Sequence, residues 1–456
     1  MPFFEKIYQD NYNKTQIGHL KNTYHLCLAT LLLLSSACSS IQPKPTTGAK
    51  IIVVWHSLNG LRERVLLDLV DRWNRSNSDN TTIIPERRDT ATIQAAMSNA
   101  NVTARPALIL GAPTQAASYY QQSYLRPLDN FITDPNPDVG WSAQDRNDLY
   151  PFVFNAGQAI DGAIIGIPFA SSIRIVMYNR NWLRTTTNVT DTIPLDWQQF
   201  TALCTKIATQ FRGTPCFGIE GNAITMDEWV NAHGERVLTS AGQVNFPSTA
   251  ISVGLERMMG LVQSGQVYRT NNSQFLREDF IAERVPFMLD WSDRIEEYRQ
   301  AVKQRSNFPL GIGLLPSVNA TASAPMQSLL WLVVKSPNTE REKYAWKFVK
   351  WLSAPEQTLR WAVATGDLPV RTSATNYFPT LQDSGLTNRQ NDVIVAFWLR
   401  MGQAAIASPA FVHIPCIKNA QSDSIRQILD GAIITSTILG FQSSVAATLV
   451  NGCFLK

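Results

Sequence analysis

The chain has 456 residues, of which 45% are hydrophobic and 17% charged, so it can bury a sizeable core. Removal of residues 1–37 would leave 37 basic and 34 acidic residues, a formal charge of +3. This weak balance lacks the basic excess of nucleic-acid-binding proteins, and we expect no nucleic-acid partner. About 400 residues follow Lys50, enough for two or more domains.

The N-terminus has the pattern of an export signal. A polar segment with three lysines precedes an apolar run that ends at Leu34 and is shorter than the roughly 20 residues of a membrane span. The small residues up to Cys38 resemble a bacterial lipobox, although Ser35 stands where the usual apolar residue would be. We expect a lipoprotein signal peptide over 1–37, lipid on Cys38, and a flexible tether over 38–49. The protein would then be anchored to the periplasmic or extracellular face of a bacterial membrane, and ordinary signal cleavage is the alternative.

Strands and helices alternate from residue 51 onward. Residues 51–55 are apolar and β-rich, and apolar residues spaced by three and four predict a helix over 61–73. A strand over 82–85, a helix over 93–100 and a strand over 107–113 follow. This order is typical of an α/β fold with a mostly parallel sheet and helices on both faces.

Loops at the carboxyl ends of such strands commonly bind ligands. The loops 56–60 and 111–115 follow the first and third predicted strands. His56, Ser57 and Gly111 are therefore candidate ligand-binding residues by topology, although His56 and Ser57 could equally lie away from the site.

The later segments continue the alternation. Residues 164–179 contain a long, mostly apolar strand, and residues 286–298 predict a strand that leads into a turn or helix start. Two further helices are predicted, one with Thr339 as a possible cap and one that starts at Pro355, a favoured first helical residue, and stops at Gly366.

The cysteine count suggests two disulfides. The six cysteines are Cys27, Cys38, Cys204, Cys216, Cys416 and Cys453. Loss of the first with the signal and lipidation of the second would leave four in an oxidising environment. Cys204 with Cys216 and Cys416 with Cys453 are the local pairings among three possible connectivities. No CxxC spacing or neighbouring histidine indicates zinc, so we expect no metal site.

Five sequence blocks occur in one order along the chain. They are WHSLNGLRERVLLDLVDRWN, YLRPLDNFI, IGIPFASSIRIVMYNRNWL, PLDWQQFTALCTKIA and KSPNTEREKYAWKFVKWLSAPEQTLRWAVATGDLPVR. They resemble the successive blocks of extracellular solute-binding proteins of ABC importers, especially the group that binds maltose, other oligosaccharides and glycerol phosphates. The resemblance covers nearly all of residues 50–456. It implies a two-lobed periplasmic-binding-protein fold, each lobe a mostly parallel sheet flanked by helices, with the ligand in a cleft that closes by hinge motion.

The resemblance also implies that each lobe is discontinuous. The chain would cross between the lobes near 168–174, near 324–330 and near Tyr377. The resulting N-terminal lobe is 50–170 with 325–376, and the C-terminal lobe is 171–324 with 377–456.

Three positions depart from the family's blocks. Ala107 stands where an acidic residue is usual, Asp367 stands where an aromatic is usual, and Leu329 to Trp331 replace a glycine-rich strand. These departures leave the expected fold and importer function unchanged, but they make the identity of the ligand uncertain.

In the family, the second lobe presents stacking aromatics where Trp229 and Trp291 stand. A flat aromatic face can pack on the apolar face of a sugar ring, and Glu228 and Asp290 could accept hydrogen bonds from hydroxyl groups. Core packing is the alternative for both tryptophans, and plain solvent exposure is the alternative for both acids.

Three further candidates come from the crossings and the last block. Ser171 and Ser172 follow the first crossing and could reach a ligand or be plain hinge residues. Arg371 matches the arginine of the last block and could pair with a phosphate or carboxylate, with a surface ion pair as the alternative. Core packing is expected for Trp55, Trp73, Trp346, Trp351 and Trp361.

The resemblance implies a substrate-binding lipoprotein of an ABC importer. It would capture a sugar, oligosaccharide, polyol or sugar-phosphate and deliver it to ABC permease subunits, as a monomer, without a cofactor and without catalysis. The sequence contains no HExxH, GxSxG or GxxxxGK[ST] motif. A lipid-anchored carbohydrate-active hydrolase is the alternative, because a pair of catalytic carboxylates needs only to meet in space.

Overall fold

The computed structural model describes residues 50–98, 104–187, 193–194, 196–238, 249–318, 323–377, 400–407 and 410–451. The predicted signal peptide, Cys38 and tether lie outside these residues. Among the described residues, no helix is both long enough and apolar enough to cross a membrane.

The strands form one large mixed sheet and one separate pair. They are β1 (Lys50–His56), β2 (Thr81–Arg87), β3 (Leu108–Gly111), β4 (Ile167–Asn179), β5 (Phe217–Glu220), β6 (Val267–Thr270), β7 (Phe287–Trp291), β8 (Leu310–Leu314), β9 (Ala324–Val333) and β10 (Ala405–Ala407). The large sheet has the order β2-β1-β3-β9-β4-β7, with β8 on β4 and β10 on β9, while β5 pairs with β6.

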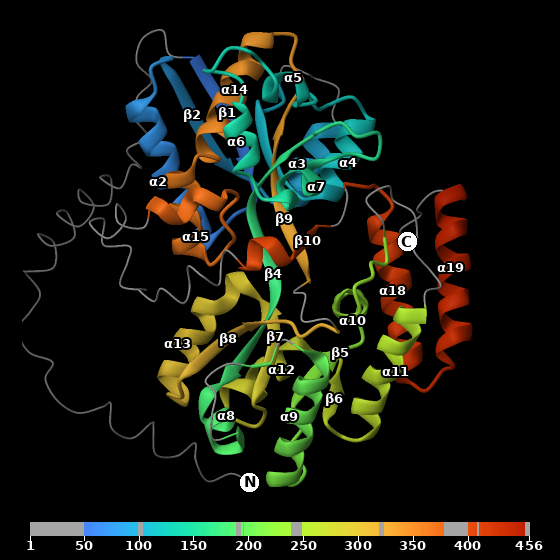
Figure 1. The fold of residues 1–456 in the computed structure, drawn as a ribbon. Helices are drawn as coiled ribbons and strands as arrows, with labels where there is room; N and C mark the ends of the chain where they lie inside the picture. The colour runs from blue at the N-terminus through green and yellow to red at the C-terminus, as the bar shows by residue number, and fades with distance from the viewer. Residues whose placement is uncertain are drawn as a thin grey trace, which may run out of the picture. The chain divides into compact units, whose positions relative to one another are not determined.

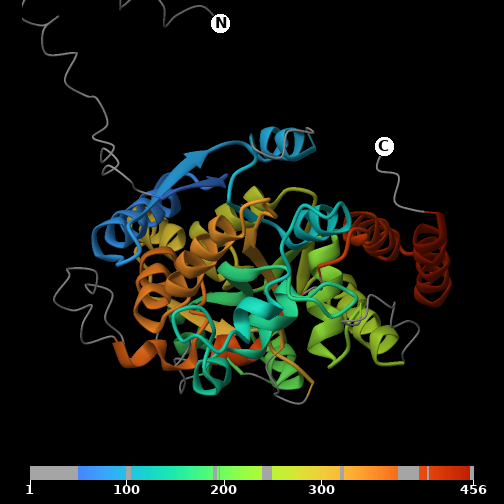
Figure 2. The same cartoon turned by 90° about the horizontal axis from the view of Figure 1, so that it is seen from above.

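Helices surround both groups of strands. In chain order they are α2 (Gly60–Ser76), α3 (Thr90–Ser98), α4 (Pro113–Gln121), α5 (Asp129–Ile132), α6 (Ala143–Asn147), α7 (Pro151–Gly157), α8 (Arg180–Thr187), α9 (Trp197–Gln210), α10 (Ala223–Ala232), α11 (Thr249–Gln263), α12 (Ser273–Ile281), η2 (Ser292–Arg294), α13 (Ile295–Arg305), α14 (Thr339–Leu352), α15 (Pro355–Thr365), η3 (Thr372–Tyr377), α18 (Ile414–Leu429) and α19 (Ile434–Asn451). Helix α2 packs against β2, α14 against β1 and β9, and α4 and α7 against β9 and β4 (Figure 1). Helices α18 and α19 pack on each other, on α10 and on α11, at the edge drawn in red in Figure 2.

The predicted α/β alternation is confirmed for the first strands. β1 pairs in parallel with both β2 and β3, with α2 and α3 as the connections. Strands β9 and β4 then run antiparallel to their neighbours β3 and β9. In the region of β7 and β8 the parallel arrangement is limited to β5 and β6, because β7 and β8 both pair antiparallel with β4.

Strand β4 connects two regions of the fold. Its residues 167–173 pair with β9, whereas residues 174–179 pair with β7 and β8. Figure 1 shows β4 passing from the strands around β9 to those around β7. Its 13 residues are almost all buried, which explains why the sequence there is a long apolar run without alternation.

Helix ends follow the sequence closely, with one exception. Helix α15 starts at Pro355 and ends at Gly366, whose φ of +80° suits glycine in a left-handed C-cap. The proposed cap Thr339 is wrong. Asn338 caps α14 instead, and its side chain accepts a hydrogen bond from the Glu340 amide at 3.1 Å.

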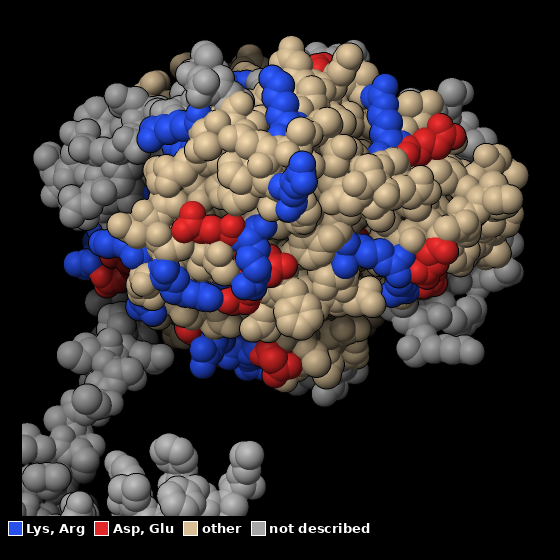
Figure 3. Space-filling model, turned by 90° about the horizontal axis from the view of Figure 1, so that it is seen from below, with Lys and Arg blue, Asp and Glu red and all other residues tan. Residues whose placement is uncertain are grey.

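The core contains most of the tryptophans expected there. Trp55, Trp73, Trp346 and Trp361 are buried, as predicted, while Trp351 is partly buried and packs against Trp73. On the face shown in Figure 3, acidic and basic side chains are interspersed, and no large area carries charge of one sign.

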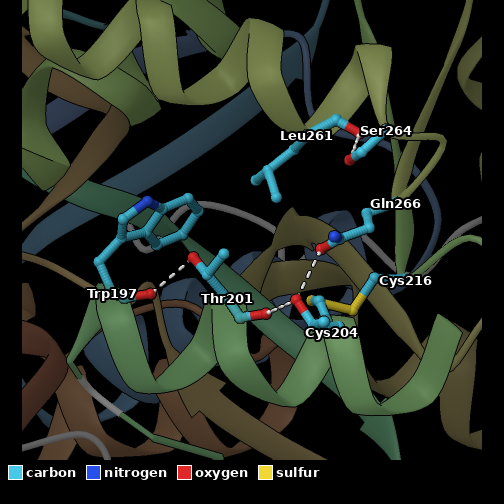
Figure 4. The surroundings of a disulfide bond; sticks show 8 residues. Trp197, Thr201, Cys204, Cys216, Leu261, Ser264 and Gln266 are labelled. Carbon is cyan, nitrogen blue, oxygen red and sulfur yellow. Dashed lines mark hydrogen bonds between the residues drawn. A yellow bond between two sulfur atoms is a disulfide. The ribbon is translucent and has the colours of Figure 1, made fainter. Parts of the chain in front are cut away.

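The predicted Cys204–Cys216 disulfide is confirmed. It joins α9 to the start of β5 across a sequence separation of 12, with 5.3 Å between the Cα atoms (Figure 4). Cys416 is also disulfide-bonded. Its predicted partner Cys453 lies outside the described residues, so this second pairing stays a prediction.

Replacing Cys204 and Cys216 together by Ser should lower the free energy of unfolding by about 2 to 3 kcal/mol, because the unfolded chain regains the freedom of a short closed loop. Urea denaturation of the double variant measures this loss, and Thr209→Ala, an exposed change on the same helix, is the control. An unchanged denaturation midpoint, or free thiols at both positions in the wild type, would contradict the prediction.

Candidate functional site

Three adjoining cavities lie where β4, β7 and β9 meet. Together they are called the candidate cleft. Their volumes are about 510, 440 and 380 Å³. The first and second share Asn222 and Trp291, and the second and third share Met326 and Gln327. Trp291, at the end of β7, therefore borders two of the three cavities.

The first cavity is a polar hollow bordered by β5, α10, α12 and β7. The charged side chains in its wall are Arg174, Glu220, Glu228, Arg277, Glu278, Asp290 and Arg294. Asn222 caps α10 by accepting a hydrogen bond from the Thr225 amide at 3.0 Å, which fixes the start of this helix at the cavity.

Arg174 organises the floor of this cavity. Its Nε donates to Glu228 Oε1, its Nη1 lies 3.4 Å from Asp290 Oδ1, and its Nη2 donates to the Leu289 carbonyl at 2.9 Å. The guanidinium carbon lies 5.3 Å from the centre of the Trp291 ring. One cation thus holds two carboxylates beside a partly exposed aromatic face.

Burial affects the protonation of this network. It raises the pKa of the Glu228 carboxyl, an effect that the positive charge of Arg174 opposes. The Tyr298 hydroxyl donates a hydrogen bond to Asp290 Oδ2 at 2.8 Å. Burial raises the pKa of this phenol, so it stays protonated and remains a donor. The resulting set of fixed donors and acceptors next to Trp291 can bind hydroxyl groups.

The third cavity has a similar arrangement around Arg62, on the first turn of α2. The Nη2 of Arg62 lies 2.6 Å from Asp293 Oδ2 and 2.8 Å from Asp367 Oδ1. Asp367 is fully buried and also accepts hydrogen bonds from Trp361 Nε1 at 2.9 Å and Thr365 Oγ1 at 3.0 Å. Burial raises the pKa of Asp367 to about 7.

The candidates chosen by strand topology lie beside the cleft rather than in its walls. His56 is 1% exposed at the end of β1, and burial lowers its pKa. Neither His56, Ser57 nor Gly111 lines one of the three cavities, whereas Ala112 and Thr114, just after Gly111, line the third. The assignment of His56, Ser57 and Gly111 to a ligand site therefore stays a prediction, which these three cavities do not support.

The two serines of β4 differ in role. Ser172 lines the third cavity and accepts a hydrogen bond from Gln327 Nε2 at 2.9 Å. Ser171 points to the opposite side of the strand, where its hydroxyl lies 2.8 Å from that of Ser328 and is fully buried. Alternation along the strand explains the difference.

Trp229 is buried in the core, which favours the core-packing alternative for this residue over a second stacking wall. It is 2% exposed and meets Trp197 edge-on, with 4.5 Å between ring centres. On helix α10, Trp229 directly follows Glu228, so the two side chains leave the helix about 100° apart. Glu228 borders the cavity, and Trp229 does not.

Arg371 is held in a buried ion pair. It is 3% exposed, donates to the Ser353 and Asp145 carbonyls, and lies 3.5 Å from the Asp148 carboxylate. These partners tie the start of η3 to α6 and to the C-terminal end of α14, outside the candidate cleft. The alternative of an ion pair is therefore correct, although the pair is buried and not on the surface.

Sequence reasoning missed Arg62, Arg174 and Gln327 as cleft residues. Arg174 could have been found, because it is the one charged residue in a mostly apolar strand, and a buried cation needs partners. Arg62 looks like any polar residue of an amphipathic helix. Only the three-dimensional structure shows that Arg62 contacts Asp293, which lies some 230 residues later in the chain.

Comparisons with known proteins agree with this architecture. The family model of the bacterial extracellular solute-binding protein matches residues 68–386. Among curated relatives, the sn-glycerol-3-phosphate-binding periplasmic protein UgpB of Yersinia pestis bv. Antiqua is 22% identical over 368 residues, which cover 76% of this chain and 79% of the relative.

Solved structures share the fold at lower identity. The cyclic alpha-maltosyl-1,6-maltose binding protein from Arthrobacter globiformis has a TM-score of 0.74 and 18% identity, and the match covers 89% of this chain and all of that one. UgpB from Mycobacterium tuberculosis, solved in complex with glycerophosphocholine, has a TM-score of 0.67 and 18% identity over 89% of this chain and 99% of that one. The fold is thus the two-lobed α/β fold that the sequence predicted. Because the family model matches more than half of this chain, the chain belongs to the bacterial extracellular solute-binding proteins.

Proposed function

We propose that the chain is the substrate-binding component of an ABC importer, which captures a sugar, oligosaccharide, polyol or sugar-phosphate in the candidate cleft. The single observation that carries this proposal is the cleft itself, where the Trp291 ring lies beside the fixed carboxylates and guanidinium of the Arg174 network. Aromatic faces and planar polar groups together are the chemistry that binds sugars.

The relatives support the same ligand class. The curated relative is described as binding sn-glycerol 3-phosphate, and the structural neighbours are described as binding cyclic alpha-maltosyl-1,6-maltose or glycerophosphocholine. An ABC permease in the membrane would receive the ligand, and the protein would work as a monomer.

Hinge closure of two lobes is part of the proposal. The lobes would be 50–170 with 325–376 and 171–324 with 377–456. The change of partners along β4, from β9 up to Ile173 to β7 from Arg174, supports a boundary there.

Isothermal titration with maltose, maltotriose, trehalose, glycerol and their phosphates tests the function, with product analysis of the same mixtures. Binding without turnover is the expected result. Turnover of an oligosaccharide would favour the alternative, a carbohydrate-active hydrolase, and the absence of both binding and turnover would contradict the proposal.

Membrane anchoring through Cys38 is a separate part of the proposal, motivated by the apolar run that ends just before it. Cys38→Ala should move the protein from the membrane fraction to the soluble exported fraction, because a lipid chain is the proposed anchor. Fractionation and mass spectrometry of the N-terminus measure the effect, with Ser40→Ala as the control. An unmodified N-terminus in the wild type would contradict lipidation.

A further inference from the structure

The two guanidinium groups at either end of the candidate cleft share one feature. Arg62 contacts the carboxylates of Asp293 and Asp367, and Arg174 contacts those of Glu228 and Asp290. Each cation therefore faces two acids. The acids are largely or fully buried, with side-chain exposures of 14% or less.

Neither group presents a net positive charge. With both acids ionised, each guanidinium and its two acids together carry a charge of −1. Arg294, 3.9 Å from Asp290, is a further cation beside the Arg174 group. Burial raises the pKa of Glu228 and of Asp367, so one acid in each group can take a proton, and the charge is then zero. In neither state does the positive charge of the guanidinium exceed the negative charge of its acids, so neither group by itself attracts a phosphate dianion through net charge.

All but one of the other cations in the described cavity walls are also paired with carboxylates. Arg277 lies 2.9 Å from Glu297, and Lys418 contacts Asp227. Arg294 lies 3.5 Å from Glu297 and 3.9 Å from Asp290. Among the described wall residues, Arg236 alone has no carboxylate partner, and it lies exposed at the middle cavity. The internal segments that the structure does not describe contain one basic residue, Arg389.

An uncharged hydroxyl group suits these walls better than a phosphate. A hydroxyl can accept from a guanidinium and donate to a carboxylate at once, whereas an ionised phosphate can only accept and is repelled by each acid. Both acids of Arg62 contact its Nη2, so they leave the Nε and Nη1 donors to other acceptors.

We infer that the candidate cleft selects an uncharged polyhydroxy ligand and discriminates against its phosphorylated counterpart, because each of its two anchoring guanidinium groups is shared by two carboxylates. This inference rests on the proposed function and narrows its ligand class.

The test uses matched pairs with the full chain purified in detergent: glycerol and glycerol 3-phosphate, glucose and glucose 6-phosphate, trehalose and trehalose 6-phosphate, with maltose and glycerophosphocholine added. We expect at least one neutral compound to bind, and its phosphate to bind at least 100-fold more weakly or below detection. Tighter binding of any phosphate than of its neutral partner, or of glycerophosphocholine than of every neutral compound, would overturn the inference and leave the importer function standing. If nothing in the panel binds, the proposed function fails, and the inference falls with it.

Two variants test the charge argument itself. Asp290→Asn and Glu220→Gln each remove one negative charge from the first cavity. Either change should reduce the ratio of the dissociation constant of the phosphate to that of its neutral counterpart at least tenfold. Asp430→Asn, an exposed acid paired with Arg269 outside the cavities, is the matched control and should leave the ratio unchanged. An unchanged ratio in both folded cavity variants would contradict the role of charge. Two variants are used because Asp290 also accepts from Tyr298, and its loss could weaken the fold.

Discussion

Trp229→Ala should lower the free energy of unfolding by about 3 to 5 kcal/mol, whereas Trp291→Ala should mainly weaken ligand binding, by about 1 to 3 kcal/mol. The difference follows from burial. Trp229 is 2% exposed and fills space against Trp197, so its truncation leaves a cavity in the core. Trp291 is partly exposed between two cavities, and its truncation removes a surface on which a ligand can pack.

Urea denaturation of the unliganded variants and ligand titration of the same preparations separate the two effects. Phe275→Ala removes a large but 60% exposed side chain on α12 and is the control for loss of aromatic area alone. A Trp229→Ala protein of nearly wild-type stability, or a Trp291→Ala protein of unchanged affinity, would contradict the assignment of that residue.

The fold was largely predictable because its signals are local. The apolar spacing of α2, the strand that became β1, and the Pro355 and Gly366 ends of α15 can each be recognised within one or two turns of chain. The antiparallel pairing of β7 and β8 with β4 could not be recognised in this way. Parallel and antiparallel pairing bury an apolar strand equally well. Which of the two forms depends on the long segments that connect the strands.

The cleft was predictable only in part, because its residues are defined by contacts in space. The resemblance to the solute-binding family was sufficient to select Trp291 and Asp290, at a strand end that borders two cavities. The same reasoning selected Trp229, one position beyond the cavity-facing Glu228, since sequence does not fix the orientation of a short helix to within one residue. Sequence identifies Arg371 only as an arginine in the family block. It does not show that the guanidinium is already paired with the carboxylates of Asp145 and Asp148.

Asp367 should make the stability of the protein fall as the pH rises. Burial raises its pKa from 3.8 to about 7, and Asp293 adds to this effect, while Arg62 and the hydrogen bonds from Thr365 and Trp361 oppose it. The folded state therefore holds the proton more tightly than the unfolded chain does. The corresponding stabilisation is fully present below about pH 4 and is lost as the pH rises through about 7, a change of up to about 4 kcal/mol.

Asp367→Asn isolates this effect, because the amide keeps the shape of the side chain and cannot ionise. The free energy of unfolding of the variant, relative to the wild type, should increase between pH 4 and pH 8. The increase should be steepest between about pH 5 and 6, where the carboxyl is ionised in the unfolded chain but still protonated in the folded wild type. Denaturation curves of both proteins at several pH values measure the difference, and Asp430→Asn, whose carboxylate is exposed, should show no such trend. Arg62→Gln should shift the wild-type transition to higher pH, because Arg62 is the cation that opposes protonation of Asp367. Parallel pH profiles for the wild type and Asp367→Asn would show that Asp367 does not titrate in this range, and that its pairing with Arg62 outweighs the cost of burial.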